Sequence, residues 1–217
     1  KFILKRCICY SPSLYLIDMF KNEDFNIAYL PNPVRLENFT YVREEVKPHS
    51  LLWVRGFTSI YNPEVPIKVL ADLKTKFPHA TLTMIGPDRG LIKSCKILAM
   101  ELGVSDDVFF IGSVPNNELY TYYQNHSVYL NTTSYESFGV AVIEAASCGI
   151  PIVSNKVGEI PYLWEHKKNM LMVENNNIES YSENVTILFE NHTEAKRISE
   201  NAREKALSFD WEILKPM

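Results

Sequence analysis

From residue 51 onward, the chain alternates short, continuous apolar runs with longer amphipathic stretches. The apolar runs lack the regular polar positions of a half-exposed strand, which is typical of strands covered on both faces of a sheet. This pattern predicts strands at residues 51–57, 80–85, 108–111, 128–130, 151–154 and 170–173. It predicts helices at residues 64–77, 91–102, 118–124 and 136–147, and two more between residues 178 and 207. The alternation indicates the α/β class, with a doubly wound, Rossmann-like parallel sheet that binds ligands at the carboxyl ends of its strands.

The first residues follow a different pattern. Residues 11–20 predict a short helix with Pro12 near its start. Residues 26–30 predict a strand that runs into a linker stiffened by prolines. We expect this segment to be too small to form its own core, and the charged residues 35–49 to form a surface connection. The chain does not begin with methionine, so we also expect the natural protein to extend upstream.

Composition narrows the possible functions. The chain has 217 residues, of which 46% are hydrophobic, as in an ordinary globular protein with a well-formed core. A formal net charge of −4 and the lack of a basic run argue against a nucleic-acid partner. No apolar stretch reaches the roughly 18 residues of a membrane span. The spacing of Cys7, Cys9, Cys95 and Cys148 fits neither a zinc site nor a disulfide framework, and indicates reduced thiols in a cytoplasmic protein.

Two glutamates, Glu136 and Glu144, bracket the most informative stretch of the chain. Polar residues 131–135 lead into the predicted helix, and residues 134–137 supply side chains that can cap it. A helix N-terminus has free backbone N–H groups that attract phosphate, and Gly139 would let a phosphate or sugar approach the backbone closely. The two carboxylates suit the hydroxyl groups of a ribose and a hexose. Eight residues of helix span roughly 12 Å, which is on the scale of a nucleotide sugar.

A second interpretation is that Glu136 and Glu144 bind no ligand, because most helical glutamates at such a spacing are solvated surface residues. The residues between and after them, 140–146, are apolar on nearly every side of the helix apart from Glu144 itself. A helix of that kind is expected to be buried. A buried acid needs a partner, and a ligand is one candidate.

Residues 136–154 resemble the donor-site signature of retaining GT-B glycosyltransferases of the group 1 type, also called glycosyltransferase family 4, which share their fold with glycogen synthase. Further stretches resemble this family in the same order. Three of them are strands with the residues that follow, at 52–57, 82–87 and 108–114. The other two are the glycine-containing turn at 157–161 and the closing helix at 209–212. The resemblance extends from about Ile27 to Leu214.

The resemblance implies a division of the chain and an activity. Residues 1–37 would be a remnant of the N-terminal acceptor domain with the interdomain linker, and residues 38–217 the nucleotide-sugar-binding domain. The enzyme would transfer a hexose from a nucleoside diphosphate sugar, UDP- or GDP-linked, to a hydroxyl acceptor on a glycan or lipid-linked glycan, with retention. Its partners would be that donor, that acceptor and the missing N-terminal domain. We expect no other cofactor, no nucleic acid, and a cytoplasmic location with membrane attachment no more than peripheral to the inner face.

The resemblance also implies roles for individual residues. Glu136 would hold the donor sugar and orient C1, while Arg55 would contact the diphosphate. The ribose hydroxyls would bind Glu144. Backbone groups would contact the phosphate, sugar or base at Phe138, Gly139, Val140, Gly112, Ser113, Val114 and Gly86.

This chain departs from the family pattern at several places. A lysine that follows the arginine by five residues is replaced by Ile60, and Asn62 and Lys68 are weak candidates to substitute for it. Glu159 replaces the second of two glycines, and Tyr162 stands where an acid is common. The chain has no Asp-x-Asp pair, so we infer that no metal takes part and that Arg55 and the helix N-terminus neutralise the leaving diphosphate.

Three alternatives remain open at this point. The lost lysine favours a non-catalytic module with a degenerate donor site, used for nucleotide-sugar binding or interaction. Another GT-B enzyme, such as an epimerase or a phosphorylase, is possible, although no motif supports a pyridoxal lysine. A Rossmann dehydrogenase would need a glycine-rich turn after its first strand, which residues 55–59 do not supply.

Overall fold

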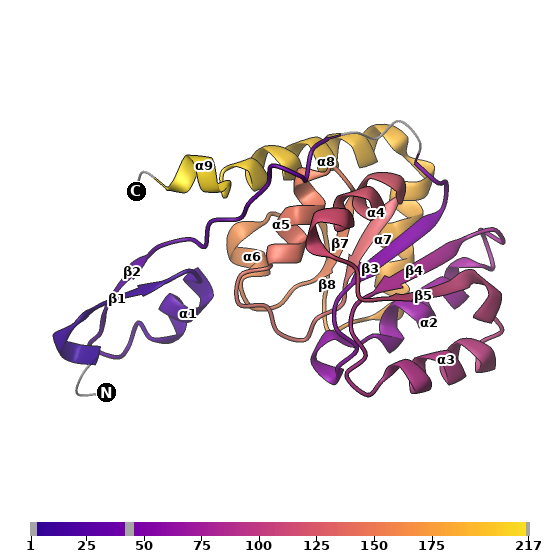
Figure 1. Ribbon diagram of the computed structural model, residues 1–217, viewed down its shortest axis with the longest axis horizontal. Helices are drawn as coiled ribbons and strands as arrows, with labels where there is room; N and C mark the ends of the chain where they lie inside the picture. The colour runs from indigo at the N-terminus through magenta and orange to yellow at the C-terminus, as the bar shows by residue number, and fades with distance from the viewer. Residues whose placement is uncertain (1–3, 42–45, 216–217) are drawn as a thin grey trace.

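A six-stranded parallel sheet forms the centre of the protein, in the strand order β5-β4-β3-β6-β7-β8 (Figure 1). The computed structural model describes residues 4–41 and 46–215. The strands are β3 (Ser50–Val54), β4 (Thr81–Ile85), β5 (Val108–Gly112), β6 (Val128–Asn131), β7 (Ile152–Asn155) and β8 (Leu171–Val173). All six predicted strands are found, and the parallel α/β fold predicted from the sequence is confirmed.

Helices cover both faces of this sheet (Figure 1). They are α2 (Glu64–Leu73), α3 (Ile92–Glu101), α4 (Leu119–Asn125), α5 (Val140–Ser147), α6 (Ile160–Leu163), α7 (Ile178–Glu190) and α8 (His192–Leu207). The short helix α9 (Trp211–Leu214) follows α8 and lies away from the sheet, near the C-terminus (Figure 1). Short 3-10 turns, η2 (Ser59–Tyr61), η3 (Ser105–Asp107) and η4 (Asn116–Glu118), join some of the elements.

The central strand β3 explains why its sequence is continuously apolar. Successive strand residues point to opposite faces, so Leu51 and Trp53 enter a core shared with α2, α3 and α7. Leu52 and Val54 enter a second core, shared with α4, α5 and the second half of α8. Two complete hydrophobic layers therefore fix this strand and, with it, the position of the loop that follows Val54.

The N-terminal segment lies to one side of the sheet (Figure 1). It contains η1 (Leu4–Arg6), β1 (Ile8–Ser11), α1 (Leu14–Met19) and β2 (Asn26–Tyr29), with β1 and β2 paired in parallel. Within residues 5–30, Ser13 is the one buried residue. The segment has no hydrophobic core of its own, as expected for so short a stretch.

The linker after this segment is more buried than predicted. Leu36 and Phe39 are 4% and 3% exposed and pack into the second core, so the predicted surface connection at 35–49 is wrong in its first part. Residues 42–45 lie outside the described residues. Val34 also pairs with the C-terminal end of the chain, because its N–H donates to the carbonyl of Phe209 at 2.8 Å. Apolar side chains, rather than charge, thus fix the path of the linker.

Candidate functional site

The predicted site residues meet at the carboxyl edge of the sheet. Arg55 directly follows β3, Gly86 follows β4, and Gly112 is the last residue of β5. Glu136 lies in the loop after β6. The chain runs outward from β3 through β4 to β5 and then returns to β6 on the other side of β3, so the loops after β3 and β6 flank the topological switch point. Open parallel sheets bind their ligands at this point.

Arg55 and Glu136 form an ion pair at the switch point. The guanidinium Nη2 lies 2.6 Å from Oε2 of Glu136, and each side chain is 13% exposed. The same nitrogen lies 3.4 Å from Oδ1 of Asn131, and the guanidinium stands over the ring of Tyr61. Burial by itself would lower the pKa of Arg55, but Tyr129, Glu136 and other neighbours outweigh burial and raise it. The guanidinium is therefore a fixed positive charge, suited to bidentate contact with a diphosphate.

Side chains hold the loop that carries Glu136. The indole N–H of Trp53 donates to Oγ1 of Thr132 at 3.0 Å. Asn62, in the left-handed region at φ 47°, donates to the carbonyl of Thr132 at 2.7 Å and to the hydroxyl of Ser134 at 2.8 Å. The side chain of Asn62, a weak candidate to replace the missing lysine, thus supports the loop, while Ile60 is 44% exposed.

Helix α5 begins later than predicted, at Val140 instead of residue 136. Gly139 precedes it with φ 91°, a left-handed conformation that glycine adopts readily, and this residue ends the loop. No side chain caps the helix, so the prediction that residues 134–137 cap it is wrong. Because only the second half of the stretch from 136 to 144 is helical, the predicted span of 12 Å along the helix is also wrong. The first N–H groups of α5 are left without a side-chain acceptor.

The residues around this helix start differ in exposure. Phe138 is buried, with its ring edge-to-face against that of Phe209 at 5.6 Å between centroids. Val140 is 44% exposed. A ligand at the helix start would therefore meet backbone groups, because the Phe138 side chain is committed to the core.

Glu144 is buried within α5 at 6% exposure. Burial raises the pKa of this carboxyl, and hydrogen bonds from Asn116 and Tyr123 together with the charge of Arg55 only partly oppose the shift. Nδ2 of Asn116 donates to Oε1 of Glu144 at 2.9 Å. Burial likewise raises the pKa of nearby Tyr129 to about 12, so this residue remains a neutral phenol. The carboxylate is hydrogen-bonded by polar neighbours, and its predicted contact with ribose hydroxyls stays a prediction.

A hollow of about 310 Å³ lies beside Arg55 at the ends of β3, β4 and β5. Its lining includes Gly86, Ser113 and Val114, which were predicted to lie beside the nucleotide. A Cβ at Gly86 would stand 1.9 Å from the carbonyl oxygen of Arg55, so only glycine lets the two loops meet. This close contact between strands is reason enough for the glycine, whether or not a nucleotide also approaches it.

Glu159 and Tyr162, the two other departures from the family pattern, both form hydrogen bonds with the N-terminal segment. Glu159 is fully buried and accepts hydrogen bonds from residues 13–15. The hydroxyl of Tyr162 donates to Asp18 at 3.1 Å.

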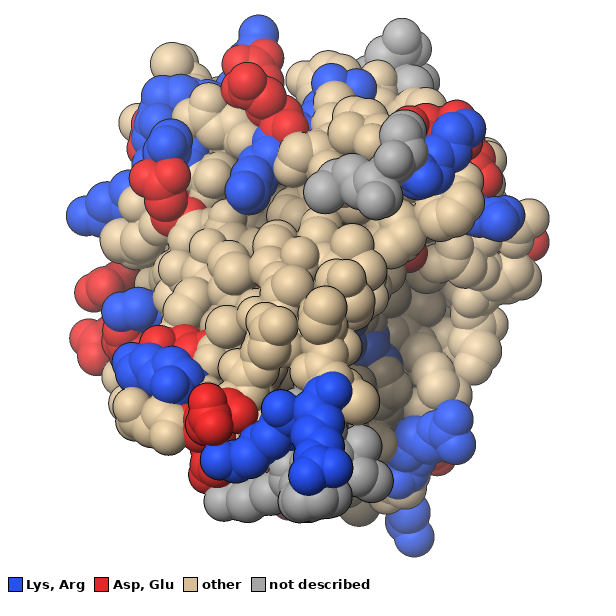
Figure 2. Space-filling model, turned by 90° about the vertical axis from the view of Figure 1, so that its left-hand side faces the viewer, with Lys and Arg blue, Asp and Glu red and all other residues tan. Residues whose placement is uncertain are grey.

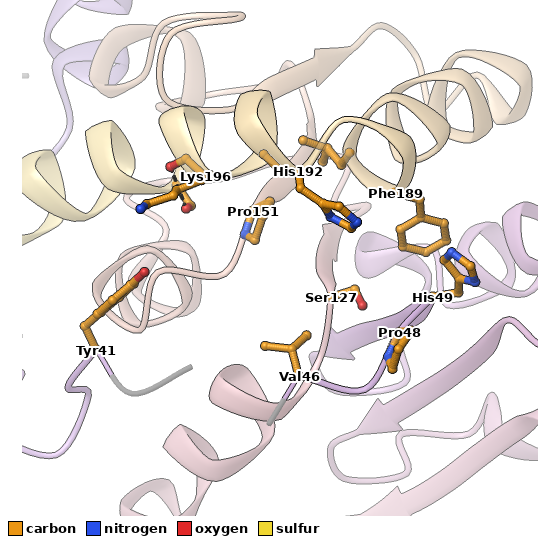
Figure 3. A pocket seen from close by; sticks show the side chains of 12 residues that line it. Tyr41, Val46, Pro48, His49, Ser127, Pro151, Phe189, His192 and Lys196 are labelled. Carbon is orange, nitrogen blue, oxygen red and sulfur yellow. Dashed lines mark hydrogen bonds between the residues drawn. The ribbon is translucent and has the colours of Figure 1, made fainter. Parts of the chain in front are cut away.

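A second hollow, of about 430 Å³, lies at the opposite, amino edge of the sheet (Figure 3). His49, Ser127 and Pro151, which immediately precede β3, β6 and β7, line it together with Lys196 and His192. The ring of His49 packs against that of Phe189, with 4.9 Å between centroids. The strand-end residues predicted to bind the donor are absent from its lining, so this hollow is separate from the candidate site.

Several residues of the site were not predicted to belong to it from the sequence. Asn116, Asn131, Tyr61, Tyr123 and Tyr129 surround Arg55 and Glu144. Tyr129 sits in β6, where the apolar pattern predicts only a buried strand, and Asn116 follows the predicted turn at 112–114. Asn131 ends β6, although the sequence placed it in the polar run that leads into the next helix. A polar residue at the end of a buried strand is the one feature that could have pointed to Asn131.

The described residues contain neither a candidate metal cluster nor a candidate membrane-spanning helix. Within 4–41 and 46–215, no group of three or more His, Cys, Asp or Glu side chains is placed to hold a metal ion. In the same ranges no helix is both long enough and apolar enough to cross a membrane. Metal-independent chemistry stays a prediction.

Comparison with known proteins identifies similar chains. A family model described as "Glycosyl transferases group 1" matches residues 36–205. The D-inositol 3-phosphate glycosyltransferase of Corynebacterium jeikeium (strain K411) is 26% identical over 156 residues, which make up 69% of this chain and 37% of that protein. The chain thus spans little more than a third of the length of this curated relative.

Solved structures show the same fold. Sucrose-phosphate synthase from Thermosynechococcus elongatus superposes with a TM-score of 0.86 at 21% identity, over 98% of this chain and 57% of that one. Alr3699/HepE of Anabaena, solved in complex with UDP, superposes with a TM-score of 0.85 at 18% identity, over 95% of this chain and 61% of that one. The predicted Rossmann-like fold of a GT-B C-terminal domain is confirmed.

Proposed function

The chain belongs to the group 1 family of glycosyl transferases, and from that membership we propose that it supplies the donor site of a hexosyltransferase. The donor is a UDP- or GDP-linked sugar, and the acceptor is a hydroxyl group of a glycan or lipid-linked glycan. The anomeric configuration of the sugar is retained in transfer. The ion pair between Arg55 and Glu136, beside the uncapped start of α5, is the observation that carries this proposal.

The ion pair suits the bond that would break. In a nucleotide sugar, C1 of the hexose is bonded directly to an oxygen of the diphosphate. Glu136 would hold the hexose and Arg55 the diphosphate, and these two groups touch one another at 2.6 Å. Arg55 and the free N–H groups of α5 would stabilise the negative charge that develops on the departing diphosphate.

Further along the carboxyl edge lie groups that could hold the ribose and then the base of the nucleotide. Glu144, buried beside Asn116, would accept hydrogen bonds from the ribose hydroxyls. The hollow lined by Ser113 and Val114 would take the base, and Arg55 borders the same hollow. A single extended ligand would thus lie across the ends of β6, β3 and β5.

The N-terminal segment supports a partner domain. This end of the molecule presents a broad surface without charged side chains (Figure 2). The segment exposes large apolar side chains, with Ile8 at 63%, Tyr10 at 64% and Met19 at 60%. We propose that the rest of an acceptor-binding domain covers them, because exposed apolar groups of this density mark interfaces. The isolated chain should then bind donor weakly and not transfer it.

One observation favours the second candidate, a non-catalytic nucleotide-sugar-binding module. Ile60 stands where the resembled family carries a lysine, so the cation that would help Arg55 neutralise the diphosphate is missing at that position.

Calorimetric titration with UDP, GDP and ADP in the absence of metal tests the donor site. We expect saturable binding of one nucleotide, lost in Glu144→Ala and kept in the matched control Glu183→Ala, whose side chain is exposed on α7. No binding to any nucleotide would contradict the proposal. Transfer assays on a longer protein that includes the acceptor domain separate the two candidates, and the anomeric proton coupling of the product reports retention.

A further inference from the structure

The carboxylate of Glu159 is fully buried at the junction between the sheet domain and the N-terminal segment. It lies just before α6 and accepts three hydrogen bonds from the segment. They come from Oγ of Ser13 at 2.6 Å and from the backbone N–H groups of Leu14 and Tyr15, both at 2.8 Å. A buried carboxylate is costly without donors, and here three donors satisfy it.

The backbone of the same turn touches the candidate site. The N–H of Glu159 donates to the carbonyl oxygen of Glu136 at 2.8 Å. Gly158, at φ 52°, approaches that oxygen so closely that a Cβ would stand 2.0 Å from it. Residue 159 therefore holds the N-terminal segment with its side chain and the backbone of Glu136 with its amide.

Aromatic rings make a second connection on the other side of Glu136. The ring of Tyr15 packs edge-to-face against Tyr135 at 5.9 Å and against Tyr162 at 6.1 Å between centroids. Tyr135 immediately precedes Glu136 in the chain. The start of α1 thus contacts Tyr135 directly and reaches the backbone of Glu136 through Glu159.

We propose that Glu159 is a positioning residue that couples the docking of the N-terminal segment to the placement of the Glu136 carboxylate. The proposal rests on the proposed donor site. When the segment is docked, the clasp, defined as Glu159 with its three donors at residues 13–15, fixes the turn that supports Glu136. When the segment moves away, the turn and the loop lose a common anchor, and the sugar end of the site loosens before the nucleotide end.

Hydrogen exchange on the full chain without ligand is the first test. In Glu159→Gln, which keeps the size of the side chain but presents an amide to the N–H donors, we expect exchange at Leu14 and Tyr15 to speed up about tenfold or more. Exchange at loop residues 134–139 should speed up as well. The control Glu165→Gln removes an exposed charge six residues further on and should change neither region.

The results separate coupling from simple capping of α1. Faster exchange in both regions supports the proposal, whereas faster exchange at residues 14–15 alone, or in neither region, overturns it. Ser13→Ala removes one of the three donors to Glu159 and leaves the glutamate in place. It should also speed up exchange in both regions, by a smaller factor than Glu159→Gln. It replaces Glu159→Gln in the test if that variant does not fold.

Ligand binding gives the second test. In Glu159→Gln, affinity for UDP-glucose or GDP-mannose should fall severalfold, while affinity for UDP or GDP stays within about twofold of wild type. An equal loss for sugar nucleotide and bare nucleotide would overturn the coupling. If the wild-type chain binds none of the four compounds, the donor-site proposal fails, and the exchange experiment alone decides whether the clasp couples the two regions.

Discussion

The sheet domain and the N-terminal segment are held together by different forces. In the sheet domain, two apolar cores enclose β3 completely, and Trp53 and Leu52 are 0% exposed on opposite faces. In residues 5–30, only Ser13 is buried, and the segment is attached through polar contacts to Glu159, through the ring of Tyr15, and by the half-buried Leu14, which packs against the second core. Apolar burial contributes most of the stability, while polar contacts contribute less and mainly fix orientation. The domain should therefore fold cooperatively, and the segment should be ordered mainly by its attachment.

The largest difference between the two regions should follow from truncating Trp53. Trp53→Ala removes a fully buried ring from the first core and the N–H donor that holds Thr132. We expect the free energy of unfolding to fall by about 3–5 kcal/mol, measured by urea denaturation. A loss below about 1 kcal/mol would show that the core does not dominate stability. Trp53→Phe, which keeps part of the ring volume, should lose less.

Ile60→Lys restores the missing cation within the sheet domain. A lysine at this 44% exposed position should raise the affinity for UDP or GDP about tenfold by adding a second positive charge near the diphosphate. The gain should shrink as salt is added, because the position is partly solvated. Ile187→Lys, at the same exposure on α7, is the matched control for calorimetry. Equal gains in both variants would assign the effect to net charge and not to the site.

Glu144→Gln should stabilise the domain while weakening nucleotide binding. Burial raises the pKa of Glu144 in the folded protein above its ordinary value of 4.5, so ionisation costs folded-state stability. We expect the free energy of unfolding of Glu144→Gln at pH 7 to exceed that of wild type by about 1 kcal/mol.

The pH dependence of this gain has a definite sign. Wild type regains stability as pH falls through the raised pKa, because the folded state then binds the proton more tightly than the unfolded chain. The advantage of Glu144→Gln should therefore narrow as pH falls and vanish below about 4.5. Thermal unfolding of both proteins across this range checks it, and an advantage that grows toward low pH would contradict the prediction.

The smallest effect should come from the exposed face of the N-terminal segment. Tyr10→Ser, at a 64% exposed position, should change the free energy of unfolding of this chain by less than about 0.5 kcal/mol. In a longer protein with the acceptor domain present, the same change should cost more, because the side chain would be covered. Equal small effects in both proteins would show that no domain packs on this face.

Local pattern explains what the sequence could predict. The strands were recognisable because each is a short apolar run, while the roles of Arg55 and Gly86 were predicted from the resemblance of residues 52–57 and 82–87 to the family. The strand predicted at 51–57 ends earlier, at Val54, so that Arg55 directly follows it. The start of α5 could not be predicted from the sequence. Residues 134–137 resemble capping residues, but the helix begins only after Gly139, whose backbone is left-handed. Such a conflict is settled by tertiary contacts of the loop rather than by propensity.

Contacts between distant residues explain what it could not. Asn116 meets Glu144 across 28 residues, and Ser13 meets Glu159 across 146. No periodicity connects such pairs, since each partner alone looks like an ordinary polar residue. The burial of Leu36 and Phe39 was missed for a related reason, because charged neighbours concealed two apolar positions.

The strand order has a consequence for the time at which the site forms. Strands β3, β4 and β5 are consecutive, whereas β6 pairs with β3 across 77 residues, as in the register of Leu51 with Val128. Long loops close slowly, so the half-sheet containing Arg55 can assemble before Glu136 arrives, 81 residues later in the chain. Arg55→Met should then accelerate unfolding and leave the folding rate nearly unchanged, as stopped-flow kinetics would show. A nascent chain would complete its two cores and bring Arg55 and Glu136 together in the same late event, so an incompletely folded molecule would lack the proposed donor site.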